Sequence, residues 1–332
     1  MKKTLLLAIM FVSIISVQAV VKVVYVTLNK TTMDASATPV TNDPIIQVLK
    51  ADPNFEVTVK VIATTDVFSD LGNYDVVIVQ ESNGGGDATL KPTGSLALKS
   101  IPKPFIYNKT YALKSTRALT TSSATGGVES TSLSITVDPT ALTNDLFKGC
   151  TIGASNEIIL FNAQMTDLGA PTGTLKSLNY SFGNVLTNNG TSINTILATP
   201  TVTTSTPAVA INDIPSGTSI DSETTIARMI ALSMNFGAIS GNGGKNITDN
   251  CLTIWRNAVY ILGGLPVPAT KATLPITGVE TLYGSSEVIS VDYYNVNGIK
   301  VLDPKDLVNG IFVKRTTYQS GSVQSEKVVF VK

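Results

Sequence analysis

Short apolar runs alternate with helical patterns in the first third of the chain. VVKVVYVTL (residues 20–28) is almost continuously β-branched, which is typical of a strand buried on both faces. FEVTVKVIA (55–63), YDVVIVQES (74–82) and KPFIYNKT (103–110) predict three more strands. TNDPIIQVLKAD (41–52) has a capping residue, a proline and an apolar stripe, and KPTGSLALKS (91–100) predicts a second short helix. This alternation predicts a parallel, doubly wound sheet.

The middle of the chain has a more strand-like pattern. STSLSITVD (130–138), ASNEIILFN (154–162) and TTIARMIALSMNF (224–236) are apolar runs. Residues 170–222 are rich in Thr, Ser, Asn and Gly, and they predict an antiparallel extension or a β-rich insertion. NITDNCLTIWRNAVYILGG (246–264) predicts a closing helix, with Thr248 or Asp249 as its cap and Gly263-Gly264 at its end.

The last part of the chain carries only β signals. A polar, proline-containing segment begins at residue 265 and predicts a linker. Asn297-Gly298 lies between two β-type runs, which is a strong hairpin signal. We therefore divide the chain into a leader (1–19), an α/β domain (20–264), a linker (265–278) and a small all-β sandwich (279–332).

Composition and the leader restrict the compartment and the partners. Lys plus Arg number 24, as do Asp plus Glu, so there is no basic footprint for nucleic acid. Lys2 and Lys3 precede an apolar stretch from Leu5 to Val17, and Val17-Gln18-Ala19 supplies small residues for cleavage. The alternative, an uncleaved anchor, is disfavoured because a span needs roughly 20 apolar residues. We expect a secreted or surface-exposed mature chain without a membrane span.

The chain contains no histidine. A Ser-His-Asp triad, a Cys-His dyad and a His-ligated zinc site are therefore excluded, and we expect no metal and no cofactor. The two cysteines, Cys150 and Cys251, are either a disulfide formed in an oxidising compartment or two buried apolar side chains.

The C-terminal residues resemble the sorting domain of the type IX secretion system. The matching segments are VDYYNVNGIKV (291–301), NGIFVK (309–314) and the terminal KVVFVK (327–332). The resemblance implies passage across the outer membrane by that machinery, removal of the tail, and attachment or release at the surface. The alternative is an ordinary small β-sandwich, since hairpin signals alone do not identify a fold.

The larger domain resembles class I glutamine-amidotransferase-like proteins, especially the ThuA-like branch. The segments that match, in order, are YDVVIVQES, KPFIYNKTYAL (103–113), LTNDLFKGC (142–150) and TDNCLTIWRNAVYILGG (248–264). The resemblance implies a flavodoxin-like, mostly parallel sheet. It also places Lys109 where an amidotransferase carries its nucleophilic cysteine. Since thiol chemistry needs a thiolate and an adjacent base, we assign no catalytic residue and lean against an enzyme.

Polar residues follow several of the predicted strands. In open α/β sheets, ligands bind outside the carboxyl ends of the strands, so these residues predict a polar cleft for a hydroxyl-bearing ligand. The predicted ligand-binding residues are Asn29, Glu81, Ser82, Asn83, Asn108, Lys109, Tyr111 and Asn235. The alternative for each is structural: the NGGGD segment is a flexible turn, and Glu81 with Lys109 is an ion pair.

Three functions follow from these observations. The first is a non-catalytic secreted or surface protein whose amidotransferase-like domain binds a glycan or a partner protein. The second is an extracellular hydrolase of carbohydrate that uses carboxylates such as Glu81 and Asp87. The third is a structural component of the envelope.

Overall fold

The structure is a computed structural model, and the chain forms two compact units, Met1–Pro275 and Ile276–Lys332. Each unit is described by itself. The residues that the structure describes are 20–27, 43–61, 67–80, 88–91, 93–109, 127–162, 180–193, 195–202, 204, 207–221, 223–234, 247–275, 288–301, 310–318 and 323–330. Among these residues, no helix has the length and apolar character needed to cross a membrane.

The first unit is built around a nine-stranded mixed sheet with the order β2-β1-β3-β4-β16-β13-β11-β6-β7. The first five strands are mutually parallel. Their bounds are β1 (Val21–Thr27), β2 (Phe55–Val61), β3 (Val76–Val79), β4 (Phe105–Tyr107) and β16 (Met229–Leu232). The four predicted N-terminal strands therefore lie where the apolar runs place them, although each strand is shorter than its run.

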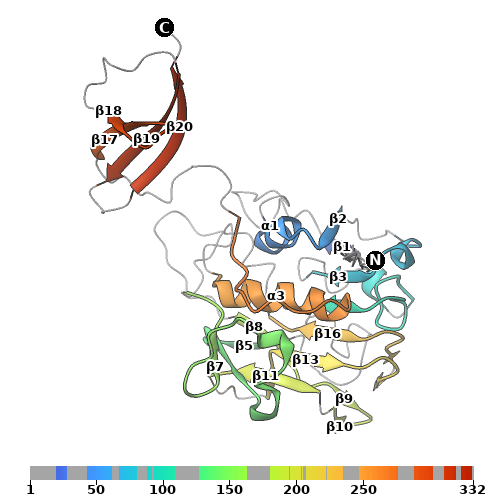
Figure 1. The fold of residues 1–332 in the computed structure, drawn as a ribbon. Coiled ribbons are helices and arrows are strands. Elements are labelled where there is room, and N and C mark those ends of the chain that lie inside the picture. Colours follow the sequence, from blue (N-terminus) through green and yellow to red (C-terminus); the bar gives the residue numbers. More distant parts are fainter. Residues whose placement is uncertain are drawn as a thin grey trace, which may run out of the picture. The chain divides into compact units, whose positions relative to one another are not determined.

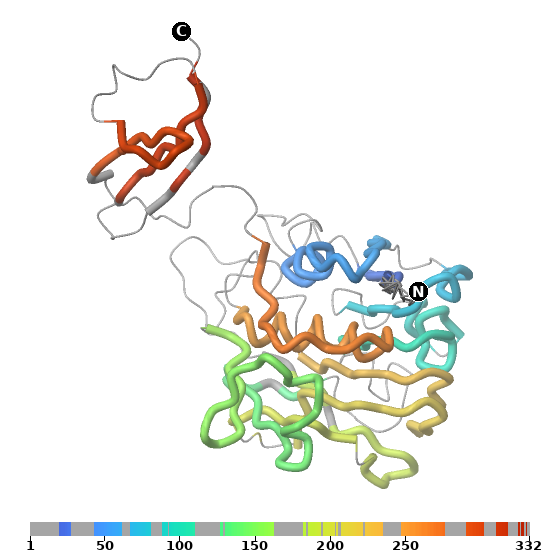
Figure 2. Tube along the Cα trace, in the orientation of Figure 1, coloured from blue at the N-terminus to red at the C-terminus, as the bar shows by residue number. Residues whose placement is uncertain are grey.

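The other four strands extend this sheet in antiparallel pairs. They are β13 (Ile211–Ile214), β11 (Ile196–Pro200), β6 (Ser134–Val137) and β7 (Glu157–Ile159). In Figure 2 the N-terminal parallel strands are blue to teal, the parallel strand β16 is gold, and the antiparallel strands are yellow to green. Two of these strands come from the Thr-, Ser- and Asn-rich region, so part of that region extends the main sheet.

Short antiparallel pairs complete unit 1. Three strands form the sheet β12-β8-β5, and the pairs β9-β10 and β14-β15 form two separate hairpins. The bounds are β5 (Val128–Ser130), β8 (Tyr180–Asn184), β9 (Thr187–Asn188), β10 (Thr191–Ser192), β12 (Ala208–Val209), β14 (Ser219–Ile220) and β15 (Glu223–Thr224).

Two α-helices, α1 (Pro44–Ala51) and α3 (Asp249–Leu262), cover one face of the main sheet (Figure 1). The odd-numbered β1 residues Val21, Val23 and Tyr25 pack in one buried cluster with both helices. α1 begins at Asp43, whose Oδ1 accepts from the amide of Ile45 at 2.9 Å. The helices predicted within residues 41–52 and 246–264 are thus confirmed, and the continuous apolar pattern of β1 reflects burial on both faces.

The second face of the sheet is covered by turns in the described part of the chain. Leu90, Leu96, Leu98 and Ile101 pack there against Val24 and Val26. The helix predicted for residues 91–100 is wrong, because the chain folds back on itself at Gly94. The amide of Leu96 donates to Thr89 O at 2.8 Å, and a Cβ on Gly94 would lie 2.2 Å from that same oxygen. The doubly wound, flavodoxin-like description is therefore not established by the described helices.

The residues that follow α3 pack against it. Val267 and Ala272 are buried, and the amide of Ala272 donates to Thr253 Oγ1 at 2.8 Å. The predicted linker, 265–278, therefore belongs to unit 1 as far as Pro275.

The second unit is a four-stranded antiparallel sheet with the order β18-β17-β19-β20. Its strands are β17 (Val288–Asn295), β18 (Lys300–Val301), β19 (Gly310–Tyr318) and β20 (Val323–Phe330). The Asn297-Gly298 turn closes the first hairpin, and Gly298 has a φ of 76°. Phe330 makes edge contacts with Tyr293 and Phe312, each at 5.7 Å between ring centroids, which gives this sheet an aromatic face. The second sheet of the predicted sandwich is not among the described residues.

Candidate functional site

The order of the parallel strands changes direction between β1 and β3, so the site predicted from the sequence lies at the carboxyl ends of these strands. Four described polar residues close this end of the sheet. They are Thr27, Gln80, Asn108 and Lys109, and all four are buried. The carboxyl end of the sheet is therefore polar, as the sequence predicts, but its described polar side chains are buried.

Asn108 holds three neighbouring strands together. Its side-chain amide donates to Leu232 O at 2.5 Å and to Met234 O at 2.7 Å, and its backbone amide donates to Val79 O at 2.9 Å. Its exposed fraction is 0%. Because both side-chain N–H groups are used within the protein, the structure gives Asn108 a structural role at the predicted site.

Lys109 follows Asn108 and is also buried, with an exposed fraction of 4%. Lys109 also has an interaction partner within the protein. The other predicted ligand-binding residues lie outside the described residues, as does Asp87. They are Asn29, Glu81, Ser82, Asn83, Tyr111 and Asn235. The structure thus brings together only Asn108 and Lys109 of the predicted set, and the ligand role of the rest stays a prediction.

A buried Tyr-Asp pair lies between β1 and the start of α1. The hydroxyl of Tyr25 donates to Asp43 Oδ2 at 2.8 Å, and the side chain of Gln80 also interacts with Tyr25. Burial raises the pKa of Asp43 to about 6, although the hydrogen bonds from Tyr25 and the helix amides lower it. Burial also raises the pKa of Tyr25 above its ordinary value.

Sequence reasoning included Asp43 only in the segment that caps the helix predicted within residues 41–52. A tyrosine within a run of valines was the available signal, because a buried hydroxyl needs a partner. The exposed fraction of Tyr25 is 0%, and that of Asp43 is 7%. The pair is therefore arranged to hold a proton inside the fold, and it positions α1 against β1.

The two cysteines are neighbours and both are free thiols. Cys150 Sγ lies 3.6 Å from Asn250 O, and Asn250 directly precedes Cys251. Burial raises the pKa of Cys150 to about 12, and it raises the pKa of Cys251 as well. Neither thiol has the lowered pKa of a nucleophile. The disulfide between them stays a prediction.

Two of the segments that carry the amidotransferase-like resemblance contact each other. Asn257, in α3, donates through Nδ2 to Leu146 O at 3.1 Å and to Lys148 O at 2.8 Å. These carbonyls belong to the turn around Asp145–Phe147, in the LTNDLFKGC segment. Both segments thus contribute to packing, at a place distant in sequence from the predicted ligand residues.

The described ranges contain no group of three or more acidic or cysteine side chains that could hold a metal ion. Comparison of the chain with protein-family models, curated proteins and solved structures found no match.

Proposed function

We propose that the chain is a non-catalytic secreted or cell-surface protein, exported by a type IX secretion system, whose larger unit binds a ligand. The observation that carries the export proposal is the independent compactness of residues 276–332. The described residues of the tail pattern lie in one antiparallel sheet: Tyr294 and Lys300 pair across the first hairpin, Gly310 begins β19, and Lys327 lies in β20. A compact terminal module suits a signal that is recognised separately from the protein it delivers.

The larger unit is proposed to be a flavodoxin-like, amidotransferase-like domain that has become a binding module. The order β2-β1-β3-β4-β16 of its parallel strands is the 2-1-3-4-5 order of flavodoxin-like sheets, which supports this proposal. Loss of the thiol chemistry is supported by the sequence, which has no histidine and has Lys109 at the elbow position. A glycan or a surface protein is the proposed ligand.

Deletion of residues 279–332 tests the export proposal. In the native host, we expect the truncated protein to accumulate inside the outer membrane, whereas the full chain reaches the surface or the medium. Cell fractionation combined with protease accessibility on intact cells measures the difference. Fusion of residues 276–332 to an exported reporter should carry that reporter across the outer membrane.

A full-length Lys50→Ala variant is the matched control, since Lys50 is an exposed residue of α1 in the other unit. It should be exported like the unmodified protein. If the protein without residues 279–332 still reaches the surface, the tail is an ordinary β domain and the export proposal fails.

A further inference from the structure

A groove lies at the opposite edge of unit 1 from the predicted site. Its walls come from the end of α1, the turn into β2, the middle of α3 and the segment after α3, and its volume is about 200 Å³. Asn54, in that turn, accepts through its carbonyl from the amide of Val21, the first residue of β1, at 2.9 Å. The groove is therefore at the amino ends of the parallel strands, where sequence reasoning did not look.

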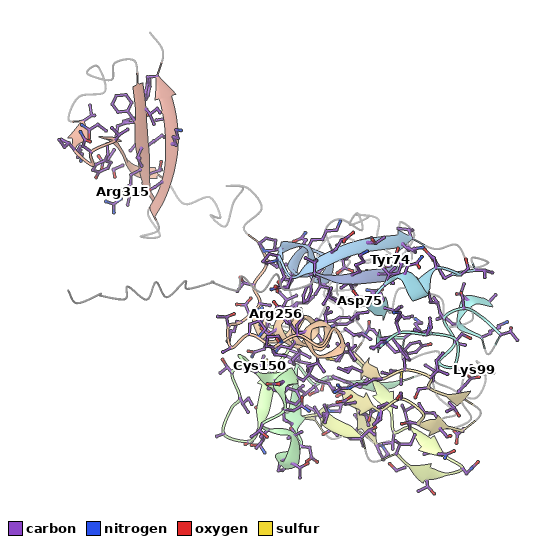
Figure 3. All side chains as sticks on the ribbon, turned by 45° about the vertical axis from the view of Figure 1, so that its right-hand side comes forward. Tyr74, Asp75, Lys99, Cys150, Arg256 and Arg315 are labelled. Carbon is purple, nitrogen blue, oxygen red and sulfur yellow. The ribbon has the colours of Figure 1, made fainter. Side chains whose placement is uncertain are left out.

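Arg256 lines this groove. Figure 3 labels this residue on α3. Its exposed fraction is 6%. Nη2 donates to Thr270 O at 2.5 Å and to Asn257 Oδ1 at 3.1 Å, whereas Nε is buried without a hydrogen-bond partner in the described chain. Burial lowers the pKa of Arg256 from its ordinary value, which shows the cost of this environment for a cation.

Asp52, the one carboxylate among the described lining residues, already accepts from neutral donors. Asp52 Oδ2 accepts from the hydroxyl of Tyr260 at 2.7 Å, and Oδ1 accepts from the backbone and side-chain amides of Asn54, both at 3.0 Å. Asp52 forms no ion pair with Arg256 at the distances of the described salt bridges. Buried charges are normally paired, but the guanidinium of Arg256 has no direct ion pair among the described residues, and Asp52 acts on it only through a longer-range electrostatic interaction.

Lys271 lines the groove beside Arg256 and is exposed. No ion pair in the described part of the chain includes it. Among the described lining residues, Arg256 and Lys271 supply two positive charges and Asp52 one negative charge, so their net charge is +1 and favours an anionic ligand. A carboxylate supplies one negative charge, whereas a phosphate monoester brings up to two.

The other lining residues indicate the chemistry of the uncharged part of the ligand. Val48 and Pro53 give the groove apolar surface, and Thr273 adds a hydroxyl. A volume of about 200 Å³ is below the roughly 300 Å³ at the lower end of drug-sized sites, so it fits about one ring. A sugar acid combines one carboxylate, an apolar ring face and hydroxyl groups.

We propose that the groove between α1, α3 and residues 271–273 binds the carboxylate of a sugar acid, with Arg256 and Lys271 holding the carboxylate. This proposal rests on the proposed function of unit 1 as a ligand-binding module and names its ligand class. The sugar ring packs against Val48 and Pro53.

Calorimetric titration of the purified full chain with galacturonate tests this proposal, with galactose as the neutral match. We expect galacturonate to bind at least about tenfold more tightly than galactose, because galactose cannot pair with the two cations. Acetate and inorganic phosphate are the further probes, and both should bind more weakly than galacturonate. Equal affinity for galactose, acetate or phosphate would overturn the assignment to a sugar acid.

Two variants locate the binding. Lys271→Ala should weaken galacturonate binding roughly fivefold, since it removes one exposed ion pair without changing the core. Arg256→Gln should abolish binding, and its far-ultraviolet circular dichroism checks that it is folded. Lys50→Ala is the control, because Lys50 is exposed on α1 but does not line the groove. An equal loss in Lys50→Ala and Lys271→Ala would contradict the proposal.

The export test and the binding test fail independently. Export of the truncated protein concerns the tail alone, and titration of the purified chain concerns unit 1 alone. If the protein is exported through its tail but does not bind galacturonate, only the groove proposal is contradicted.

Discussion

At the scale of single residues, Asp43 is a carboxylic acid that the fold has removed from water. One of its oxygens caps α1 and the other accepts from Tyr25, yet burial outweighs both bonds and raises its pKa from 3.8 to about 6. The folded chain therefore holds this proton to a higher pH than the unfolded chain does. The corresponding stabilisation is complete below about pH 3.8 and is lost as the pH rises to about 6.

Asp43→Asn should remove this loss of stability at higher pH. Asparagine caps a helix as well as aspartate does, and it carries no charge to bury. Relative to the unmodified protein, the free energy of unfolding of Asp43→Asn should rise by about 2 kcal/mol between pH 4 and pH 7. Urea unfolding across this pH range measures the difference.

Tyr25→Phe provides the opposite change. It removes the hydrogen bond that lowers the pKa of Asp43, so the pH-dependent loss should extend to higher pH. If the free energy of unfolding changes with pH in the same way for Asp43→Asn and the unmodified protein, Asp43 does not titrate between pH 4 and pH 7.

At the scale of elements, α3 is the centre of unit 1 because its polar side chains bind segments far away in sequence. Asn257 binds the carbonyls around residue 147, Thr253 accepts from Ala272, and Arg256 donates to Thr270. Gly149 lies in the same contact region. Its φ is +81°, and a Cβ there would lie 2.8 Å from Thr270 O. The turn, the helix and the following segment are therefore packed as one group.

Asn257→Ala should reduce the free energy of unfolding by about 2 kcal/mol, because it leaves buried carbonyl oxygens without a donor. Hydrogen exchange of the backbone amides in residues 145–151 should also become faster. Asn144→Ala is the comparison: it removes only the local bond from the amide of Leu146, at 2.9 Å, and should cost about 1 kcal/mol. Equal exchange rates in Asn257→Ala and the unmodified protein would show that α3 does not hold the turn.

The elements that were predictable from the sequence are those whose signals are local. The cap at Thr248 and the apolar positions of α3 lie within the helix itself, as does the β-branched run of β1. The turn at Gly94 was missed because its conformation depends on Thr89, which lies outside the predicted helix. The Tyr25–Asp43 pair and the groove were missed for a related reason: they join residues 18 and about 200 positions apart. The pattern of residues along the chain does not show which residues far apart in sequence contact each other.

At the scale of the whole molecule, the position of the unit boundary decides which residues complete the groove. Composition placed the end of the α/β domain at Gly264, since prolines and polar residues follow it. The structure extends unit 1 to Pro275, because residues 265–275 bury Val267 and Ala272 and accept a hydrogen bond from Arg256. A proline-rich composition indicates that a segment is not helical, and it does not indicate whether the segment packs.

Two truncations distinguish these boundaries. A chain that ends at Pro275 should unfold at the same urea concentration as unit 1 within the full chain. A chain that ends at Gly264 should lose about 4 kcal/mol, because Val267 no longer packs and the bonds to Thr253 and Arg256 are lost. The shorter chain should also lose galacturonate binding, since Lys271 is absent. If both truncated chains unfold at the same urea concentration, residues 265–275 are a linker, and the wall that they give the groove does not persist in solution.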